Sequence, residues 1–240
     1  MPPSAVTAPT PIPSAVDRRS VPDPAAARWS AVAGAALVLL VWTALRARAP
    51  GSLEQAWLLA IASRRSEGLT EVMLTLIRAH SAVVGLLVLA SLALLVCYRR
   101  WADAAQLLCV GLTVGALVPL VKHTLRLARP EALALMPVSG YGFPSGHTAA
   151  AAAGVAMVLI AAARCGVALP ARIAAAVLGT AWVAAVAISR LYLGAHYPSD
   201  VLASLALMAT CLCAYRVLRA KAVSGAVRVQ PVQPWANTIR

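Results

Sequence analysis

Long apolar stretches without charge are the feature that most constrains this chain of 240 residues. Several of them run for about 16 to 21 residues, and roughly 20 helical residues cross a hydrocarbon core of about 30 Å. Hydrophobic residues make up 61% of the chain and charged residues only 12%, which is too apolar for a soluble domain of this length. The sequence therefore predicts an all-α integral membrane protein that crosses the bilayer several times.

We expect a bundle of about six transmembrane helices between two tails. The expected spans are residues 29–45, a second that ends near 98, then 104–121, 145–163, 173–188 and 201–218. Residues 1–28 are rich in Pro, Ala and Ser, which predicts a disordered cytoplasmic tail. Residues 29–220 would form the membrane domain, and 221–240 a second cytoplasmic tail.

Two segments ahead of the second span have mixed character. The first span also resembles a signal peptide, because residues 47–49 are similar to a small-residue cleavage site. Pro50 directly after them and the long preceding tail argue against cleavage. Between residues 52 and 80, apolar residues recur at helical spacing but charged residues interrupt them, which predicts an interfacial amphipathic helix that leads into the second span.

The distribution of basic residues predicts the orientation in the membrane. Six spans place both tails on one side, and 12 of the 21 Lys and Arg residues fall in the tails and in the two loops on that side. The nine on the other side include Lys122, Arg129 and Arg190, which belong to the motifs described below. Because basic loops stay cytoplasmic, we expect cytoplasmic termini and motifs that face outward, toward the periplasm if the source is a bacterium.

Charge and cysteine content exclude two other classes of function. The net charge of +13 is compatible with nucleic-acid binding, but the basic residues form no run longer than two and do not alternate with stacking aromatics. The five cysteines lack the paired spacing of zinc sites. We therefore expect no nucleic-acid partner. The sequence carries no signal for a particular oligomeric state.

Three polar clusters interrupt the apolar sequence, and all three fall at span ends on the same predicted side. They are Lys122 with Arg129-Pro130, then Pro144-Ser145-Gly146-His147, and then Ser189-Arg190 with His196 and Asp200. Phosphoryl transfer needs fixed positive charge around three equatorial oxygens, and three of these residues are cations. The backbone amides of Ser145 and Gly146, at the start of a helix, would add donors where the helix dipole favours an anion.

The two histidines of these clusters fit the remaining roles. His196 precedes Asp200 by four residues, so the carboxylate can accept one ring N–H and direct the other nitrogen outward. His147 is then available as the acid that protonates the leaving oxygen.

Together the clusters resemble the signature of the type 2 phosphatidic acid phosphatase (PAP2) superfamily of membrane lipid phosphatases. The patterns K-x6-RP, PSGH and SR-x5-H-x3-D are met at all eleven specified positions, across residues 122–200. The resemblance implies a metal-independent reaction without a cofactor, in which His196 becomes phosphohistidine, Asp200 orients it, and His147 protonates the leaving alcohol and then activates water. It also implies that five residues hold the phosphate: Lys122, Arg129, Ser145, Gly146 and Arg190.

Structural explanations exist for each residue taken singly. Asp200 is also an acid in a first helical turn, Arg190 and Lys122 are also interfacial anchors, and residues 144–146 also suit a simple turn. We expect no site role for His80 or His123, an interfacial position for Tyr192, Tyr197 and Trp101, and we assign no role to Arg126. The joint occurrence of three clusters on one side favours the catalytic interpretation.

The leading hypothesis is hydrolysis of a lipid phosphate or diphosphate whose tail stays in the bilayer. The outward-facing site favours undecaprenyl diphosphate, with phosphatidylglycerophosphate, phosphatidate and lipid A phosphates as alternatives. Vanadium haloperoxidase chemistry is a second hypothesis, although those enzymes are soluble. A lipid or anion carrier is a third, and transfer of phosphate to an acceptor other than water is a variant of the first.

Overall fold

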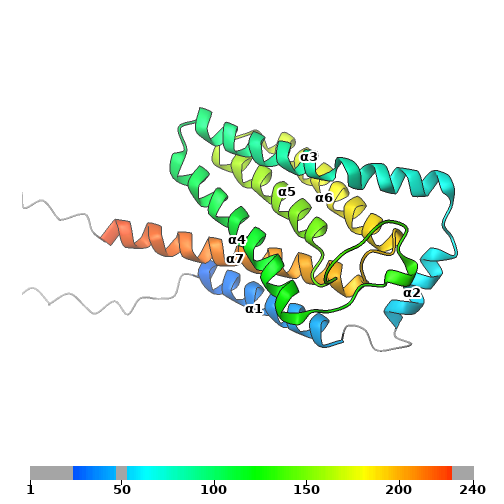
Figure 1. The fold of residues 1–240 in the computed structure, drawn as a ribbon. Coiled ribbons are helices and arrows are strands. Elements are labelled where there is room, and N and C mark those ends of the chain that lie inside the picture. The colour runs from blue at the N-terminus through cyan, green and yellow to red at the C-terminus, as the bar shows by residue number, and fades with distance from the viewer. Residues whose placement is uncertain (1–23, 47–52, 229–240) are drawn as a thin grey trace, which may run out of the picture.

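The computed structural model describes residues 24–46 and 53–228 of the chain, and these residues form helices joined by short loops and one longer one (Figure 1). The helices are α1 (Pro24–Arg46), α2 (Leu53–Ala62), α3 (Glu67–Cys97), α4 (Trp101–Leu125), the 3-10 helix η1 (Glu131–Leu133), α5 (Gly146–Arg164), α6 (Leu169–Tyr192) and α7 (Pro198–Arg228). The described residues contain no strand. The all-α prediction is therefore confirmed.

Five of these helices are long and apolar enough to cross a membrane: α3, α4, α5, α6 and the Pro198–Arg219 part of α7. The expected first span, residues 29–45, falls within α1. Helix α1 begins at Pro24, inside the segment expected to be disordered, and α7 continues to Arg228, inside the expected C-terminal tail. The rest of the two expected tails, 1–23 and 229–240, lies outside the described residues.

The segment expected as an interfacial helix and a run-in to the second span corresponds to α2 and the first turns of α3. The break falls at Ser66, whose backbone is extended (φ −134°, ψ 155°) and whose hydroxyl accepts a hydrogen bond from the backbone N–H of Leu69. A serine followed by an acid, here Glu67, is a favourable helix start. Helix α3 therefore begins at Glu67, includes the charged residues Glu71 and Arg78 in its first turns, and runs unbroken for 31 residues.

Helix α5 lies inside the bundle, with α3, α4, α6 and α7 packed around it, while α1 lies along α7 (Figure 1). Its alanine-rich first half lets neighbouring helices approach closely, as small residues do in membrane bundles. A Cβ atom added to Gly179 of α6 would lie 2.4 Å from Val155 Cγ1 of α5, so the absence of a side chain sets that distance of approach. The small residues thus make α5 the central helix of the fold.

One buried carboxylate joins three helices at the end of the bundle where α5 ends. Asp103, at the start of α4, pairs with Arg219 of α7, with Arg164 of α5 at 3.8 Å and with Arg100 at 3.6 Å. Three arginines around one acid leave this end basic. The polar clusters of the sequence lie at the other end.

Two loops interlock at that other end and carry the clusters. The loop between α4 and α5 is tied to the loop between α6 and α7 by a hydrogen bond from the Leu135 N–H to the Leu193 carbonyl (2.9 Å). Gly194 makes this contact possible, because its φ is +67° and an added Cβ would lie 2.1 Å from the Leu133 oxygen. Only glycine tolerates both conditions without cost.

Helix α2 and the turn after it support these loops from outside. The carboxylate of Glu54 accepts hydrogen bonds from the backbone N–H (2.6 Å) and hydroxyl (3.0 Å) of Ser199, in the first turn of α7. Arg65 donates to the carbonyls of Tyr192 and Leu133, each at 2.9 Å. The segment from 53 to 66 therefore fixes the end of α6 and the start of α7, two residues from His196.

Candidate active site

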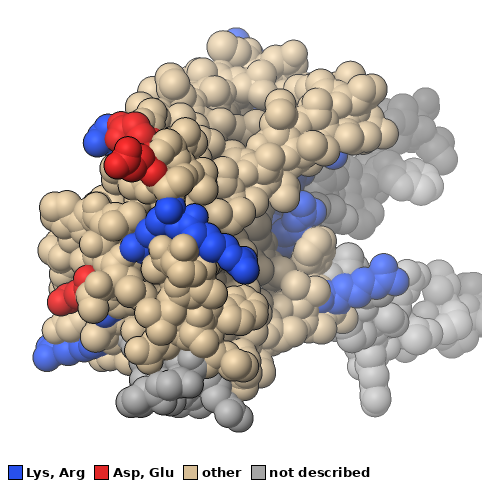
Figure 2. Space-filling view, turned by 90° about the vertical axis from the view of Figure 1, so that its right-hand side faces the viewer, with Lys and Arg blue, Asp and Glu red and all other residues tan. Residues whose placement is uncertain are grey.

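A pocket of about 370 Å³ opens where the three sequence clusters meet. It is lined by His80, Ser81, Lys122, Arg129, Gly146, His147, Arg190 and His196. Six of the eight residues expected at the site are in this set. Figure 2 views this end of the molecule and shows basic side chains gathered in the middle of the face, beside a hollow.

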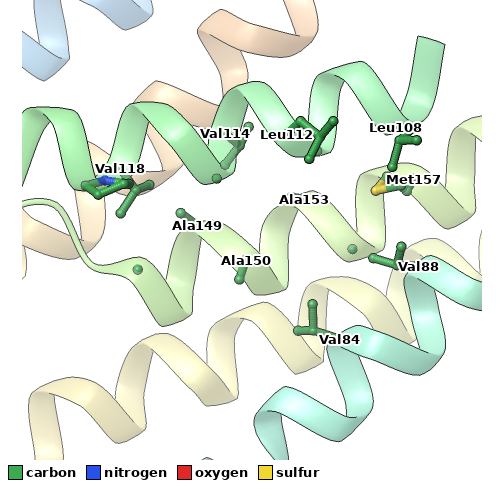
Figure 3. A pocket seen from close by; sticks show the side chains of 15 residues that line it. Val84, Val88, Leu108, Leu112, Val114, Val118, Ala149, Ala150, Ala153 and Met157 are labelled. Carbon is green, nitrogen blue, oxygen red and sulfur yellow. The ribbon is translucent and has the colours of Figure 1, made fainter. Parts of the chain in front are cut away.

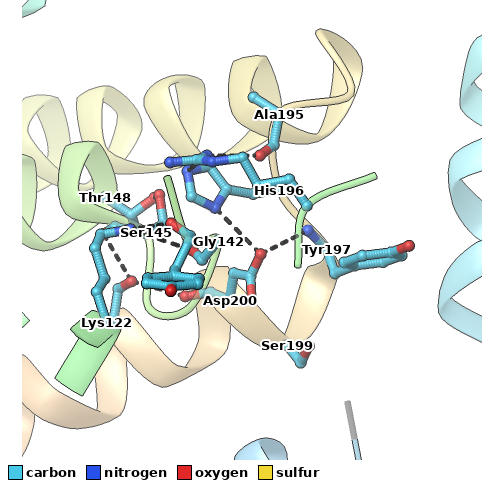
Figure 4. A network of polar contacts seen from close by, with 12 residues as sticks. Lys122, Gly142, Ser145, Thr148, Ala195, His196, Tyr197, Ser199 and Asp200 are labelled. Atoms are coloured by element: carbon cyan, nitrogen blue, oxygen red, sulfur yellow. Dashed lines mark hydrogen bonds and ion pairs between the residues drawn. The ribbon is translucent and has the colours of Figure 1, made fainter. Parts of the chain in front are cut away.

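His196 and Asp200 form the buried pair that their spacing predicts (Figure 4). The ring Nδ1 lies 3.1 Å from Asp200 Oδ2, and the backbone N–H of Tyr197 donates to the same oxygen at 3.0 Å. The other ring nitrogen, Nε2, lies 3.0 Å from Arg129 Nη1. Because a guanidinium only donates, Nε2 accepts, and the proton of the neutral ring is on Nδ1, facing the carboxylate.

The surroundings keep this imidazole neutral. Burial lowers the pKa of His196 to about 4, and the positive charges of Arg129 and Arg190 act in the same direction, while Asp200 opposes them. At neutral pH the Nε2 lone pair is therefore available to a ligand in the pocket.

Main-chain carbonyls hold two of the three cations in place. Lys122 Nζ donates to the carbonyls of Tyr141 (3.0 Å) and Gly142 (3.4 Å). Arg129 donates through Nε to Gly140 (3.1 Å) and through Nη1 to Ala195 (2.9 Å).

The third cation, Arg190, is only 3% exposed, and its Nη1 lies 3.4 Å from Met136 Sδ. The described residues that line the pocket include three cations and no carboxylate. The pocket therefore favours a multiply charged anion.

Ser145 was expected to hold the phosphate, but it is not among the residues that line the pocket. It is fully buried, its backbone N–H donates to the Asp200 carbonyl at 3.0 Å, and its hydroxyl accepts from Thr148 Oγ1 at 3.1 Å. The hydroxyl of Ser204 donates to the carbonyls of both Ser145 (2.8 Å) and Asp200 (2.7 Å). Ser145 thus ties the start of α5 to the start of α7, and Gly146, the first residue of α5, is the one that lines the pocket.

His80 is the site residue that sequence reasoning missed. It is 4% exposed, lines the pocket, and its ring centroid lies 4.9 Å from that of His147. The available signal was its position: a histidine inside an otherwise apolar span is costly in a membrane and marks a functional site by default.

Two other expectations from the sequence are changed by the structure. Tyr192, expected at the membrane interface, is 5% exposed, and its hydroxyl bonds to the backbone of Ser66 and to Thr70 Oγ1 (3.1 Å). Arg126, left without a role, ends α4 in the left-handed conformation (φ 50°) and donates to the His123 carbonyl at 3.1 Å. Neither Arg126 nor His123 is among the residues that line the pocket.

An apolar groove of about 410 Å³ adjoins the site between α3, α4 and α5 (Figure 3). Its walls are Val84 and Val88 on one side, Leu108 and Leu112 on another, and alanines of α5 at its floor. Gly146 lines both the groove and the polar pocket. The groove thus leads from the anion pocket into the apolar part of the bundle.

Comparisons with known proteins agree with this arrangement. The family model of the PAP2 superfamily matches residues 103–223. The fold is similar to the crystal structure of a transmembrane PAP2 type phosphatidylglycerolphosphate phosphatase from Bacillus subtilis, with a TM-score of 0.66 and 23% sequence identity over 85% of this chain and 98% of that one. A search of curated proteins found no significant match. Within the described part of the chain, no three His, Cys, Asp or Glu side chains group as metal ligands would.

The anion pocket, the helical fold and the family match lead to one conclusion. This chain belongs to the PAP2 superfamily and is a multi-pass membrane phosphatase.

Proposed function

We propose that the protein hydrolyses a lipid phosphate or diphosphate without a metal ion, through a phosphohistidine intermediate on His196. The observation that carries this proposal is the state of the His196 ring, whose Nδ1–H faces a buried carboxylate and whose Nε2 lone pair faces Arg129 in an anion pocket. This is the arrangement of an activated nucleophile with an orienting partner.

In the first step, Nε2 of His196 attacks phosphorus and the bond from phosphorus to the leaving oxygen breaks. The leaving oxygen keeps the electron pair and takes a proton from His147. The phosphate displaces Nε2 from Arg129, and Lys122, Arg129 and Arg190 then stabilise the equatorial oxygens.

In the second step, a water molecule attacks the phosphohistidine. The phosphorus–nitrogen bond breaks, its electron pair returns to Nε2, and His147, now neutral, accepts the proton of the water. Asp200 stays hydrogen-bonded to Nδ1 in both steps and stabilises the positive charge on the phosphorylated ring.

The apolar groove supports a lipid as the substrate. A head group in the polar pocket would place the first part of its tail against Gly146 and then between α3, α4 and α5. Two observations support cytoplasmic termini and a site that faces the periplasm. Lys and Arg are in excess in the tails and in the loops on their side of the membrane. Three arginines surround Asp103 at the end of the bundle remote from the site.

Undecaprenyl diphosphate is available on the periplasmic face and fits this location, while the fold similarity makes phosphatidylglycerolphosphate an equally direct test substrate. Phosphatidate and lipid A phosphates complete the set, because the pocket recognises the group that all four share.

The test is phosphate release by the detergent-purified protein from these four lipids, with EDTA present. His196→Ala is the inactive variant, and His123→Ala is the matched control, since His123 is exposed and lies outside the pocket. We expect EDTA-resistant release that His196→Ala abolishes and His123→Ala preserves. Activity retained in His196→Ala would refute the nucleophile, and loss in EDTA would refute metal independence. Lipid transport without hydrolysis would support the carrier hypothesis instead.

A further inference from the structure

Three buried polar atoms of the described residues lack a hydrogen-bond partner, and they lie around one spot. They are His80 Nδ1, Trp182 Nε1 and Arg190 Nε. His80 and Arg190 both line the anion pocket. Trp182 lies two helical turns before Arg190 on α6, and its ring is parallel to that of His80, with an interplanar angle of 8° and centroids 6.3 Å apart. Unpaired polar atoms are rare in proteins and gather where a ligand or a catalytic role accounts for them.

The surroundings of His80 define which of its nitrogens can bind a ligand. Nδ1 is buried and has neither a donor nor an acceptor beside it, so it does not select the tautomer of the neutral ring. A phosphate in the pocket only accepts, and it would select the tautomer whose proton is on Nε2. The ring centroid lies 6.3 Å from that of Trp182 and 4.9 Å from that of His147. His80 therefore offers one N–H donor at the edge of the pocket beside the proposed acid.

The position beside His147 is on the leaving-group side of the pocket. His147 delivers its proton to the leaving oxygen in the proposed reaction, whereas His196 attacks from the opposite side, since nucleophile and leaving group lie in line. In a lipid monophosphate the group next to that oxygen is a hydrocarbon. In a lipid diphosphate it is a second phosphate, which needs donors of its own.

The charge of the pocket agrees with a larger anion. Three cations line it, and no carboxylate does among the described residues. A phosphate monoester carries only about −1.5 to −2 at pH 7, so it leaves part of this positive charge uncompensated. A diphosphate supplies the additional negative charge.

We propose that His80 is a specificity-determining residue that donates a hydrogen bond to the leaving phosphate of a lipid diphosphate. The inference rests on the proposed phosphatase function and names the substrate class of the same site. It assigns the departing phosphate to the space between His80, His147 and Arg190.

The test compares an isoprenyl diphosphate with the isoprenyl monophosphate of the same chain length, in detergent, as kcat/KM for phosphate release. His80→Phe keeps a ring to stack on Trp182 and removes the donor. We expect it to lower kcat/KM for the diphosphate about tenfold or more, as loss of a hydrogen bond to a charged group does. For the monophosphate we expect a change below about threefold, which also shows that the variant is folded.

Two further variants separate the donor from the ring. His80→Gln keeps an N–H donor and should restore most of the diphosphate activity, while His123→Phe should leave the ratio of the two activities unchanged. Equal losses on both substrates, no loss on either, or a wild-type protein that hydrolyses only the monophosphate would each overturn the role of His80. In those three cases His196→Ala still abolishes activity. A wild-type protein inactive on both substrates would overturn the proposed function together with this inference.

Discussion

Replacing Asp200 by asparagine removes one negative charge beside His196 and changes the shape of the side chain very little. The two donors that reach Asp200 Oδ2, the ring Nδ1–H of His196 at 3.1 Å and the Tyr197 N–H at 3.0 Å, both require an acceptor. The amide oxygen of the introduced asparagine would therefore take that position, and the ring would keep its tautomer. The variant thus separates the charge of Asp200 from its orienting role.

The magnitude follows from the distance and from the burial of the pair. Two unit charges about 4 Å apart attract by about 4 kcal/mol at an effective dielectric constant of about 20. If about half a positive charge has developed on the ring in the transition state, the loss is about 2 kcal/mol. That corresponds to a roughly 30-fold slower formation of phosphoenzyme. Asp200 is fully buried and His196 is 1% exposed, so solvent screens the interaction little.

Rapid-quench measurement of phosphoenzyme formed in a single turnover is the direct assay, since phosphohistidine survives alkali. We expect Asp200→Asn to form the same intermediate about 30-fold more slowly than wild type. A rate equal to that of wild type would show that the charge does not stabilise the ring. A folded variant that forms no detectable intermediate would show that the tautomer was lost, which would contradict the hydrogen-bond argument above.

Two other predictions test the loop geometry and the protonation state of the nucleophile. Gly194→Ala should lower the melting temperature and reduce kcat about tenfold or more, because the added Cβ would lie 2.1 Å from the Leu133 oxygen. Gly166→Ala is the control, since Gly166 has a similar φ of +70° with open space around it. It should cost only about 1–2 kcal/mol of stability and leave kcat unchanged. Because burial lowers the pKa of His196 to about 4, kcat/KM should show no limb near pH 6.5 beyond the second ionisation of the substrate phosphate at about pH 6, which a titration of the free substrate measures separately. Since the unfolded chain binds the His196 proton first, stability should also decline as pH falls from 6.5 toward 4. A stability that stays constant over this range would contradict the lowered pKa of His196.

The sequence predicted the membrane helices and six of the eight residues that line the candidate pocket, because both signals are local. Apolar length identifies a span wherever the chain places it, so each of the four spans from 104–121 to 201–218 falls on one of the helices α4 to α7. The span 145–163 agrees with α5 to within one residue at each end, whereas α4, α6 and α7 extend beyond the expected spans by three to ten residues. The eleven signature positions identified Lys122, Arg129 and Arg190 before any packing was known. The pair His196 and Asp200 is local as well, because four residues of separation bring the two side chains to one helix start.

The helix boundaries near the N-terminus were less predictable, because the local signals in that part of the sequence are mixed. Charged residues between 52 and 80 mask the start of α3, and one serine cap at Ser66 divides that segment. Apolar residues at helical spacing predict helices in this segment, but they do not locate the residue at which one helix ends and the next begins.

By itself the sequence determined the helical membrane class, the three cations and two of the three histidines that line the candidate pocket, and the order in which the chain supplies them. Only the tertiary structure decided which way individual groups face. Ser145 turns its amide to Asp200 and away from the phosphate pocket, Arg126 ends a helix outside that pocket, and His80 reaches the pocket beside His147. The physical reason is that a residue's position along a helix fixes its face, but the neighbour that this face meets depends on how helices distant in sequence pack.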